Sequence, residues 1–347
     1  MSDAPLPPLP AEALALGIAR TLPGTRIACT SPGRAQAAWS LAAERPDAAV
    51  SAWFLDAFHF DAALAAHGTV PDGLSVTCAP DLPAGPFDLA IVPLSRDGEA
   101  ELSRDILQAA LLALEPGGQL VAAVDNPRDT WLHGQLADTR ERVGVRHGED
   151  AVAYVVTKTR PPRVRDFSAT VVFRDRERLL TAFTRPGVFA HRRVDPAARH
   201  LLNAVDVAPG TRVVDIGCGS GCVALGIAAR DPPVVVHALD SNARAVECTR
   251  RAATANGLDN VTVALEATGA IPDPGSWDLV LANPPYYADF RIAKLFVDAA
   301  HRALAPGGTL LVATKRPAWY LETLPATWRD VAREEVKHYH LVEAVRP

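Results

Sequence analysis

The sequence contains no uninterrupted run of about 18 apolar residues, the length that a transmembrane helix requires. Its first residues have neither the basic nor the apolar segment of a secretory signal. Cysteine is scarce: the five cysteines are scattered, and no second Cys/His pair completes a zinc set with Cys218 and Cys222. We therefore expect a cytoplasmic protein with free thiols, no membrane segment and no metal site.

The composition that remains is typical of a folded protein with more than one domain. Hydrophobic residues make up 48% and charged residues 22% of the 347 residues, which is near the globular norm and excludes general disorder. At about 100–200 residues per domain, the length predicts two domains. The net charge of −5 argues against general affinity for nucleic acids, although it leaves room for a local basic patch.

Comparing the sequence with itself shows an internal duplication. Three segments recur in the same order and at a nearly constant offset: PGTRI at 23–27 as PGTRV at 209–213, FDLAI at 87–91 as WDLVL at 277–281, and ALEPGGQL at 113–120 as ALAPGGTL at 303–310. The offset is 186 residues for the first segment and 190 for the other two. Each match alone is ordinary turn chemistry, but three in order indicate one domain present twice.

Each copy alternates strand and helix patterns. In the second copy the strands are expected at 212–216, 234–239, 261–265, 278–282 and 309–313, and the helices at 223–230, 243–256 and 292–304. In the first copy the strands are expected near 26–30, 49–54, 88–93 and 119–124. This alternation predicts an α/β protein in which each half is a parallel sheet covered by helices on both faces.

A basic segment separates the two copies. Residues 157–193 contain ten Lys and Arg against three Asp and Glu, a net charge of +7 that leaves about −12 for the rest. The segment is either a solvated linker or a surface that binds phosphate groups. We therefore expect a first domain over 1–156, a basic linker over 157–193 and a second domain over 194–347.

A glycine-rich loop follows the first strand of the second copy. Asp215, Gly217, Gly219 and Gly221 form an Asp-x-Gly-x-Gly-x-Gly pattern between a buried strand and a helix, where glycine permits a tight turn and close approach to a ligand. The next strand ends at Asp240, whose carboxylate either binds two ribose hydroxyls or caps the following helix. Cys222 stands where the last glycine of the dinucleotide fingerprint belongs, which disfavours a dehydrogenase.

The loop and Asp240 together resemble the class I S-adenosylmethionine-dependent methyltransferases. The resemblance implies S-adenosylmethionine as the cofactor. It also places Ser241, Glu266 and Ala267 near the cofactor, from the position of these residues in the fold alone.

The fourth strand of the second copy is followed by Asn283, Pro284, Pro285 and Tyr286. Two prolines fix a rigid turn at the end of a strand, where open α/β sheets bind ligands. The Asn283 side-chain oxygen and the Pro284 carbonyl can both accept from one planar NH₂ group, which aims the nitrogen lone pair at a sulfonium methyl, while Tyr286 stacks on the flat group. The alternative is a loop whose prolines merely end a strand. On a methyltransferase-like domain, the tetrapeptide predicts methylation of a planar nitrogen.

The nitrogen is guanine N2, adenine N6 or the glutamine amide in families with this tetrapeptide, so context must decide. Gly187, Val188 and Phe189, with Asp195, precede the glycine loop, and the whole chain resembles the bacterial ribosomal RNA guanine-N2 methyltransferases. The chain departs from that family at Tyr286, where phenylalanine is usual, and at Ala197 and Ala198, where Gly-Ser is usual.

The resemblance implies a catalytic second half and a first half that has lost its cofactor site and helps to recognise RNA. At the offset of 186, Cys29, Ser31, Gly33 and Ala35 replace the residues of the glycine loop. At the offset of 190, residues 93–96 (PLSR) replace the tetrapeptide. We therefore expect no cofactor binding by the first copy, and RNA contacts from Arg163, Arg165, Arg192 and Arg193. The alternatives are an adenine-N6 RNA methyltransferase, a protein glutamine-N5 methyltransferase, a small-molecule methyltransferase and a non-catalytic RNA-binding factor.

Overall fold

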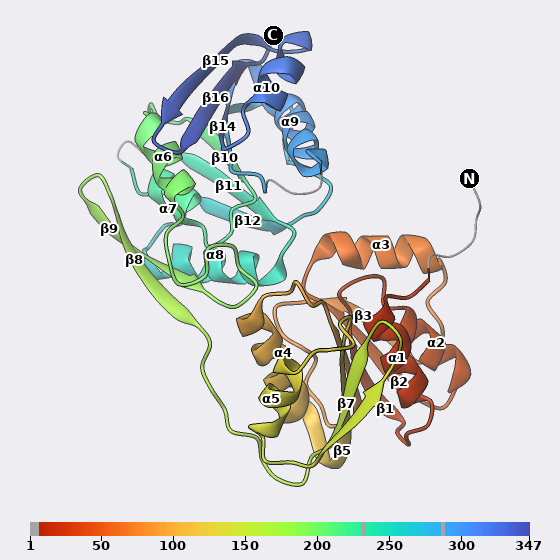
Figure 1. Ribbon diagram of the computed structural model, residues 1–347. Coiled ribbons are helices and arrows are strands. Elements are labelled where there is room, and N and C mark those ends of the chain that lie inside the picture. The colour runs from red at the N-terminus through yellow and green to blue at the C-terminus, as the bar shows by residue number, and fades with distance from the viewer. Residues whose placement is uncertain (1–6, 231–233, 286–288) are drawn as a thin grey trace. The chain divides into compact units, whose positions relative to one another are not determined.

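A computed structural model describes residues 7–230, 234–285 and 289–347. The chain divides into two compact units, Met1–Phe167 and Ser168–Pro347, and each contains a seven-stranded sheet with the same strand order (Figure 1). The repeated segments occupy equivalent places, since residues 23–27 lead into β1 (Arg26–Thr30) and residues 209–213 lead into β10 (Arg212–Ile216). The predicted α/β fold with two Rossmann-like halves is confirmed. No helix in the described part of the chain is long and apolar enough to cross a membrane.

The sheet of the second unit is mixed rather than wholly parallel. Its order is β12 (Val261–Leu265), β11 (Val235–Asp240), β10, β13 (Trp277–Ala282), β14 (Leu304–Thr314), β16 (Tyr339–Val345) and β15 (Arg329–Val336). The five neighbours β12, β11, β10, β13 and β14 are parallel. The pairs β14–β16 and β16–β15 are antiparallel. The prediction of a parallel sheet is therefore wrong at this edge. Most of β15 is exposed and charged, which protects an edge strand from pairing with other chains and leaves little apolar alternation to find.

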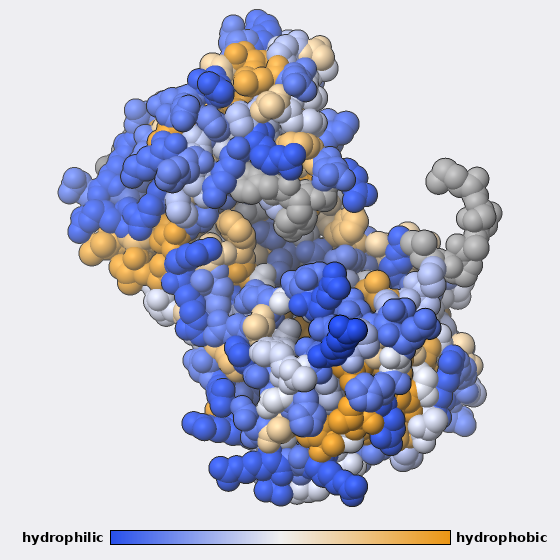
Figure 2. All heavy atoms as spheres, viewed as in Figure 1, coloured by the Kyte–Doolittle hydropathy of each residue, from blue (hydrophilic) through white to orange (hydrophobic). Residues whose placement is uncertain are grey.

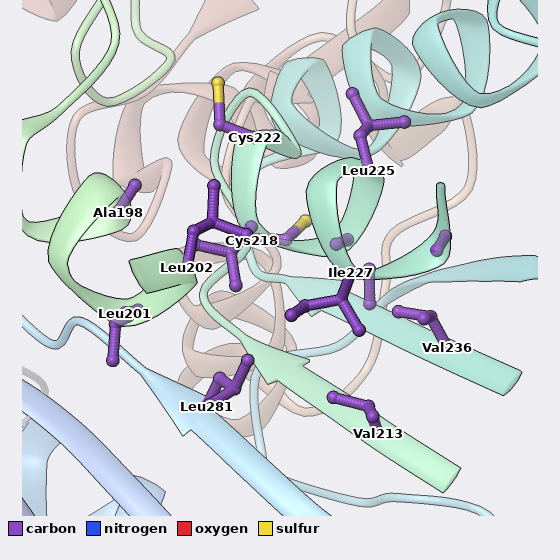
Figure 3. Close-up of a cluster of buried hydrophobic side chains, with 14 of the residues drawn as sticks. Ala198, Leu201, Leu202, Val213, Cys218, Cys222, Leu225, Ile227, Val236 and Leu281 are labelled. Carbon is purple, nitrogen blue, oxygen red and sulfur yellow. The ribbon is translucent and has the colours of Figure 1, made fainter. Parts of the chain in front are cut away.

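Helices cover both faces of this sheet. They are α6 (Pro196–Ala204), α7 (Cys222–Ala228), α8 (Ala243–Ala255), α9 (Arg291–Ala303) and α10 (Ala318–Thr323), followed by the short 3₁₀ helix η1 (Leu324–Ala326). On one face, Leu201 of α6 and Leu225 of α7 pack in the same core as Val213 of β10 (Figure 3). On the other face, Val214 of β10 packs in a core with Val297 of α9. Because neighbouring side chains of β10 point to opposite faces, this strand joins both cores.

The strand order changes direction at β10. This strand has β11 on one side and β13 on the other, although β13 comes two strands later in the chain than β11. The loops after β10 and β13 therefore leave the same edge of the sheet on either side of a crevice, which is where open α/β sheets bind ligands. The glycine loop and Asn283 are the segments that leave the sheet there.

The first unit repeats this arrangement. Its sheet has the order β3 (Leu74–Cys78), β2 (Ala49–Phe54), β1, β4 (Phe87–Leu94), β5 (Leu114–Val124), β7 (Val152–Thr157) and β6 (Val143–His147). Its helices are α1 (Pro10–Ala19), α2 (Gln36–Glu44), α3 (Ala57–His67), α4 (Ala100–Ala113) and α5 (Trp131–Ala137). The four predicted strands are present, and β3, β6 and β7 are additional.

The basic segment, for which we expected a linker over 157–193, spans the boundary between the units at Phe167 and Ser168. Its second part forms a hairpin of β8 (Ala169–Asp175) and β9 (Arg178–Thr184) in the second unit. The buried Arg230 guanidinium fixes the hairpin, with Nε 2.9 Å from Asp175 Oδ2. Asn256 also bonds both backbone groups of Thr181, at 2.9 and 2.7 Å.

One face of the hairpin packs on the protein and the other is exposed. Phe173 and Leu180 are each 3% exposed, whereas Val172 and Leu179 are 62% and 63% exposed and belong to the apolar surface visible on the hairpin in Figure 2. Apolar residues on both faces, mixed with arginine, obscure the alternation from which a half-buried strand is recognised.

Candidate active site

The glycine loop adopts a conformation that only glycine accommodates. Gly217 and Gly221 have φ values of +74° and +79°. A Cβ on Gly221 would lie 2.8 Å from the side chain of Thr249, and one on Gly217 would lie 3.0 Å from the ring of Phe296. The backbone conformation therefore disfavours larger residues at both positions, and at Gly221 a Cβ would also overlap the side chain of Thr249.

Hydrogen bonds from the neighbouring strand and helix hold the loop. The N–H groups of Gly217 and Cys218 donate to the Leu239 carbonyl at 2.8 and 3.0 Å. The Thr249 hydroxyl donates to the Gly219 carbonyl at 3.1 Å. The loop is thus fixed before any ligand binds, which reduces the entropy cost of binding.

Asp240 lies at the end of β11 and faces this loop. Its Oδ2 accepts from the Gly219 N–H at 2.9 Å, and its Oδ1 accepts from the Asn242 N–H at 2.8 Å. The alternative expectation that Asp240 caps α8 is wrong, because the N-cap is Asn242, which accepts from the N–H groups of Arg244 and Ala245. Both Asp240 oxygens therefore lie at the end of β11 against the glycine loop and the start of α8, and the half-buried Ser241 follows Asp240.

Asp215 lies beneath the loop and has a supporting position. It is 3% exposed, and its Oδ2 accepts from the Ala224 N–H at 3.0 Å in the first turn of α7. Burial, opposed by that hydrogen bond and reinforced by the nearby Asp240 charge, raises the pKa of Asp215 to about 7. This carboxyl group holds the start of α7 under the glycine loop.

The raised pKa of Asp215 predicts a pH-dependent stability. Folding raises the pKa from 3.8 to about 7, so the folded chain holds a proton between these values that the unfolded chain releases. Stability is therefore expected to fall as pH rises from about 4 to about 7, and to level off above that. Asp215→Asn removes this dependence, so its melting temperature relative to the wild type is expected to increase with pH. Calorimetry from pH 5 to 8 measures this, and a constant difference would contradict the assignment.

Glu266 and Ala267 follow β12, at the same edge of the sheet as Asp240. The Glu266 N–H donates to the Asp240 carbonyl at 2.9 Å, and its carboxylate accepts from the N–H and hydroxyl of Thr268. Burial acts to raise the pKa of Glu266, but hydrogen bonds from Thr268 and the following backbone lower it below its usual value. The Glu266 backbone therefore lies beside Asp240, and its carboxylate is held by Thr268.

Asn283 follows β13, whose last residues are fully buried, and Pro284 is buried after it. The Asn283 Nδ2 donates to the Asp195 Oδ2 at 2.9 Å. Among the residues that the structure describes, no hydrogen bond engages Asn283 Oδ1, which is left as an acceptor. Pro285 is half-buried, and Tyr286, the last residue of the predicted tetrapeptide, lies outside the described residues.

The segment before α6 connects the glycine loop with Asn283. The Asn242 side chain donates to the Gly187 carbonyl at 3.0 Å, and the fully buried Arg244 donates to the Pro186 carbonyl at 2.9 Å. Phe189 is 61% exposed, and its Cβ lies 3.8 Å from where a Cβ on Gly219 would be. The segment then reaches Asp195. Sequence reasoning missed the contact between Asp195 and Asn283, because the two residues are 88 positions apart and Asp195 has the sequence context of a helix cap.

A stack of planar side chains follows the described part of the turn. The rings of Phe290 and Trp319 lie 5.2 Å apart and nearly parallel, and the Arg316 guanidinium lies 4.5 Å from the Phe290 ring centre. The Trp319 ring is half-buried, and it packs against the core on this face of the sheet.

The four predicted RNA-binding arginines do not belong to one unit. Arg163 and Arg165 lie in the first unit, and Arg192 and Arg193 lie in the second, in the segment that precedes α6. Arg163 and Arg165 line a groove of about 770 Å³ that also has Arg104, Arg140 and Arg160 on its walls. Gln108 of α4 fixes the segment, because its side chain bonds both backbone groups of Arg165 at 2.7 and 2.9 Å.

The two cysteines near the glycine loop are packing residues. Cys218 and Cys222 are 8% and 4% exposed, and burial raises the pKa of both thiols above the usual value. No group of three His, Cys, Asp or Glu that could hold a metal ion is present within residues 7–230, 234–285 and 289–347.

Comparison with known proteins finds one family model and several relatives that are similar to this chain. The methyltransferase small domain model matches residues 180–342, which begin within β9 and include the glycine loop and Asn283. The ribosomal RNA small subunit methyltransferase C of Pseudomonas aeruginosa strain LESB58 is 29% identical over 241 residues, covering 66% of this chain and 70% of that protein. The protein of the same name from Chromohalobacter salexigens is 34% identical over 141 residues, covering 38% of this chain and 41% of that protein.

The two-unit fold also matches a solved structure. The T. thermophilus 16S rRNA N2 methyltransferase, solved in complex with AdoMet and guanosine, superposes with a TM-score of 0.80 over 97% of this chain and 92% of that one. The sequence identity is 22%, so this likeness establishes the fold.

Proposed function

We propose that this chain belongs to the methyltransferase family that these relatives represent and that it methylates N2 of a guanine base in ribosomal RNA. Ribosomal RNA as substrate implies the cytoplasm as the place of action. The observation that carries the proposal is the fixed Asn283 side chain, which leaves its Oδ1 as an acceptor beside the glycine loop at the switch point of the sheet.

The residues of the second unit fit S-adenosylmethionine. A glycine loop without side chains at Gly217 and Gly221 would let a ligand approach the backbone, and the Asp240 carboxylate beside it would accept hydrogen bonds from the two ribose hydroxyls. Ser241, Glu266 and Ala267 complete the proposed cofactor contacts at the same edge, while Asp215 supports the loop from below. When bound, the cofactor supplies an electrophilic methyl group.

Asn283 and Pro284 would position the base. The Asn283 Oδ1 and the Pro284 carbonyl would each accept a hydrogen bond from one N–H of the exocyclic NH₂ group, so that the nitrogen lone pair stands out of the plane toward the methyl group. The reaction would join the base nitrogen to the methyl group as that group leaves the cofactor sulfur, and the nitrogen would release one proton to solvent. Orientation and electrostatic stabilisation of the cationic nitrogen account for the rate.

The competing functions give different products in one experiment. The purified protein is incubated with unmodified ribosomal RNA and S-adenosylmethionine, and the nucleosides are identified by mass spectrometry. N2-methylguanosine supports the proposal, whereas N6-methyladenosine would replace guanine by adenine. If the methyl group were transferred to glutamine or to a small molecule and not to RNA, the substrate would not be a nucleic acid. If calorimetry detects no binding of the cofactor, the chain is a non-catalytic RNA-binding factor.

We further propose that the first unit neither binds the cofactor nor catalyses. In its loop the Ser31 hydroxyl accepts from the N–H groups of Gly33 and Ala35 at 3.1 and 2.8 Å, so the backbone donors are satisfied internally. Leu9 lies 3.5 Å from where a Cβ on Gly33 would be. Phe54, at the end of β2, stands where β11 ends in Asp240. The unit keeps the fold and lacks the groups that hold a nucleoside.

In the first unit, a different residue provides the carboxyl group that supports the loop. The strand residue Cys29 occupies the place of Asp215, and the buried Glu12 of α1 instead accepts from the Ala37 N–H at 3.0 Å in the first turn of α2. A buried acid under this helix therefore supports the fold, and its presence alone does not indicate a cofactor site.

We propose that both arginine pairs bind RNA phosphates. In the described part of the first unit, no ion pair engages Arg163 or Arg165, so their charges are available to an anion. Removing one positive charge that contacts a phosphate lowers the magnitude of the slope of log K against log[salt] by about 0.7 for single-stranded RNA. Each double variant, R163Q/R165Q and R192Q/R193Q, is therefore expected to lower the slope by about 1.4 and to raise Kd about tenfold.

The matched control is R128Q/R146Q, which removes the same charge from exposed positions of the first unit outside the groove. Fluorescence anisotropy with a labelled ribosomal RNA fragment at several salt concentrations measures all three. A pair whose variant behaves like the control is not part of the RNA surface.

A further inference from the structure

Asp195 contacts two groups with one oxygen. Its Oδ2 accepts from the Asn283 Nδ2 at 2.9 Å and from the Ala197 N–H at 3.0 Å. Carboxylate oxygens accept and do not donate, so the Asn283 amide must turn its NH₂ toward Asp195 and its Oδ1 away. The orientation that the proposed chemistry requires is therefore fixed by a residue outside the tetrapeptide.

The two contacts of Asp195 suggest two roles, a helix cap and a partner for Asn283. Asp195 is the N-cap of α6, which begins at Pro196 and packs Leu201 in the core. Aspartate is a common N-cap, and this role alone would account for its presence. The internal duplication separates the two roles.

In the first unit the equivalent helix forms without a capping side chain. At the offset of 186, Leu9 replaces Asp195, and α1 begins at Pro10 with no side-chain cap hydrogen bond at Leu9. At the offset of 190, Pro93 replaces Asn283. The carboxylate and the amide are thus absent together from the copy that lacks the other site residues, while the helix remains. Helix formation does not require Asp195.

We propose that Asp195 is a positioning residue that holds the Asn283 amide with its Oδ1 toward the exocyclic amine of the base. The hydrogen bond from Nδ2 fixes which end of the amide is Oδ1, provided that position 195 presents an acceptor oxygen at this distance. The α6 helix, anchored in the core, thereby fixes the turn after β13. This inference rests on the proposed function, because it assigns the partner of the residue that would bind the base.

Three variants of the full chain test the pair. D195S keeps a helix-capping side chain but is too short to hold the Asn283 amide, and its kcat is expected to fall about 10- to 100-fold. D195N keeps an oxygen at the same distance and is expected to stay within about threefold of the wild type. The control D56S makes the same change at the N-cap of α3, where Asp56 accepts from the Phe58 N–H at 2.8 Å, and is expected to leave kcat unchanged.

The affinities separate positioning from general damage. KM for RNA and the Kd of S-adenosylmethionine are expected to stay within about twofold in D195S, because the amide orientation acts on the reacting nitrogen. If D195S matches D56S in kcat, the proposal is overturned. Equal losses in D195S and D195N, with a lowered melting temperature, would assign Asp195 to the fold alone and would also overturn it.

A spectroscopic measurement tests the pair without any turnover. The Asn283 side-chain NH₂ signal of the ¹⁵N-labelled chain is identified by its loss in Asn283→Ala. D195S is expected to shift this signal, whereas D56S is expected to leave it in place. An unshifted signal in D195S overturns the proposed pair. If D195S shifts the signal but the wild-type chain methylates no RNA, the proposed function is overturned and the pair is not.

Discussion

Replacing Asn283 by alanine is expected to lower kcat by about 10²- to 10³-fold while S-adenosylmethionine binds as before. The magnitude is that of removing one fixed polar group that stabilises a transition state. The change removes the Oδ1 acceptor, and with it the alignment of the nitrogen lone pair. The cofactor contacts proposed for Gly217, Gly219 and Asp240 lie on other strands and keep their own hydrogen bonds. Single-turnover methylation of RNA measures kcat, and calorimetry measures the cofactor affinity.

The matched control for this change is Asn203→Ala. Asn203 lies on the exposed side of α6, the helix that Asp195 caps, so the control changes the same residue type next to the site without touching it. Unchanged turnover in Asn283→Ala would remove this residue from the chemistry. A parallel loss of cofactor binding would show that Asn283 acts on the cofactor rather than on the base.

The features that could be predicted from sequence are those that depend on residues close together in the chain. The glycine loop is such a case, because the φ angles and close approaches at Gly217 and Gly221 force the residue type at each position. The position of Asp240 follows from the length of one strand after one helix. The duplication added the two-unit architecture, since a repeated turn sequence implies a repeated strand beside it.

The contacts that could not be predicted join segments distant in the chain. The pair of Asp195 and Asn283 bridges 88 residues, and each member has a sufficient local explanation as a helix cap or a strand end. The hairpin β8–β9 was obscured because its buried Asp175 is paired with Arg230, 55 residues away, so a charge occupies a buried place. The edge strand β15 is charged because its position requires it. In each case the tertiary partner decides the residue type.

The first unit lacks the proposed site residues at the equivalent positions, and this difference makes the duplication informative about function. Substitutions at Leu9, Phe54 and Pro93 fall at the places of Asp195, Asp240 and Asn283, yet the sheet order is retained. A side chain that the fold requires is kept in both copies or replaced by another with the same role, as Glu12 replaces Asp215. The residues that differ are therefore candidates for chemistry, and those that agree are candidates for folding.

Replacing Asp240 by alanine is expected to weaken S-adenosylmethionine binding about 10²-fold. Two hydrogen bonds from ribose hydroxyls to a charged acceptor contribute about 1.5–3 kcal/mol each, of which water recovers a part. The substitution also frees the N–H groups of Gly219 and Asn242, so weaker binding alone would not distinguish a ribose contact from a loosened loop.

A change in the ligand separates these two causes. S-adenosylhomocysteine and its 2′-deoxyribose analogue differ by one hydroxyl, and calorimetry gives the ratio of their Kd values. The wild-type ratio is expected to be about tenfold or more, whereas the ratio for Asp240→Ala is expected to approach one, because the acceptor of that hydroxyl is gone. The control Asp206→Ala removes an exposed carboxylate from the same unit and should keep the wild-type ratio. If Asp240→Ala kept the wild-type discrimination, the ribose would bind elsewhere, and Asp240 would only hold the glycine loop.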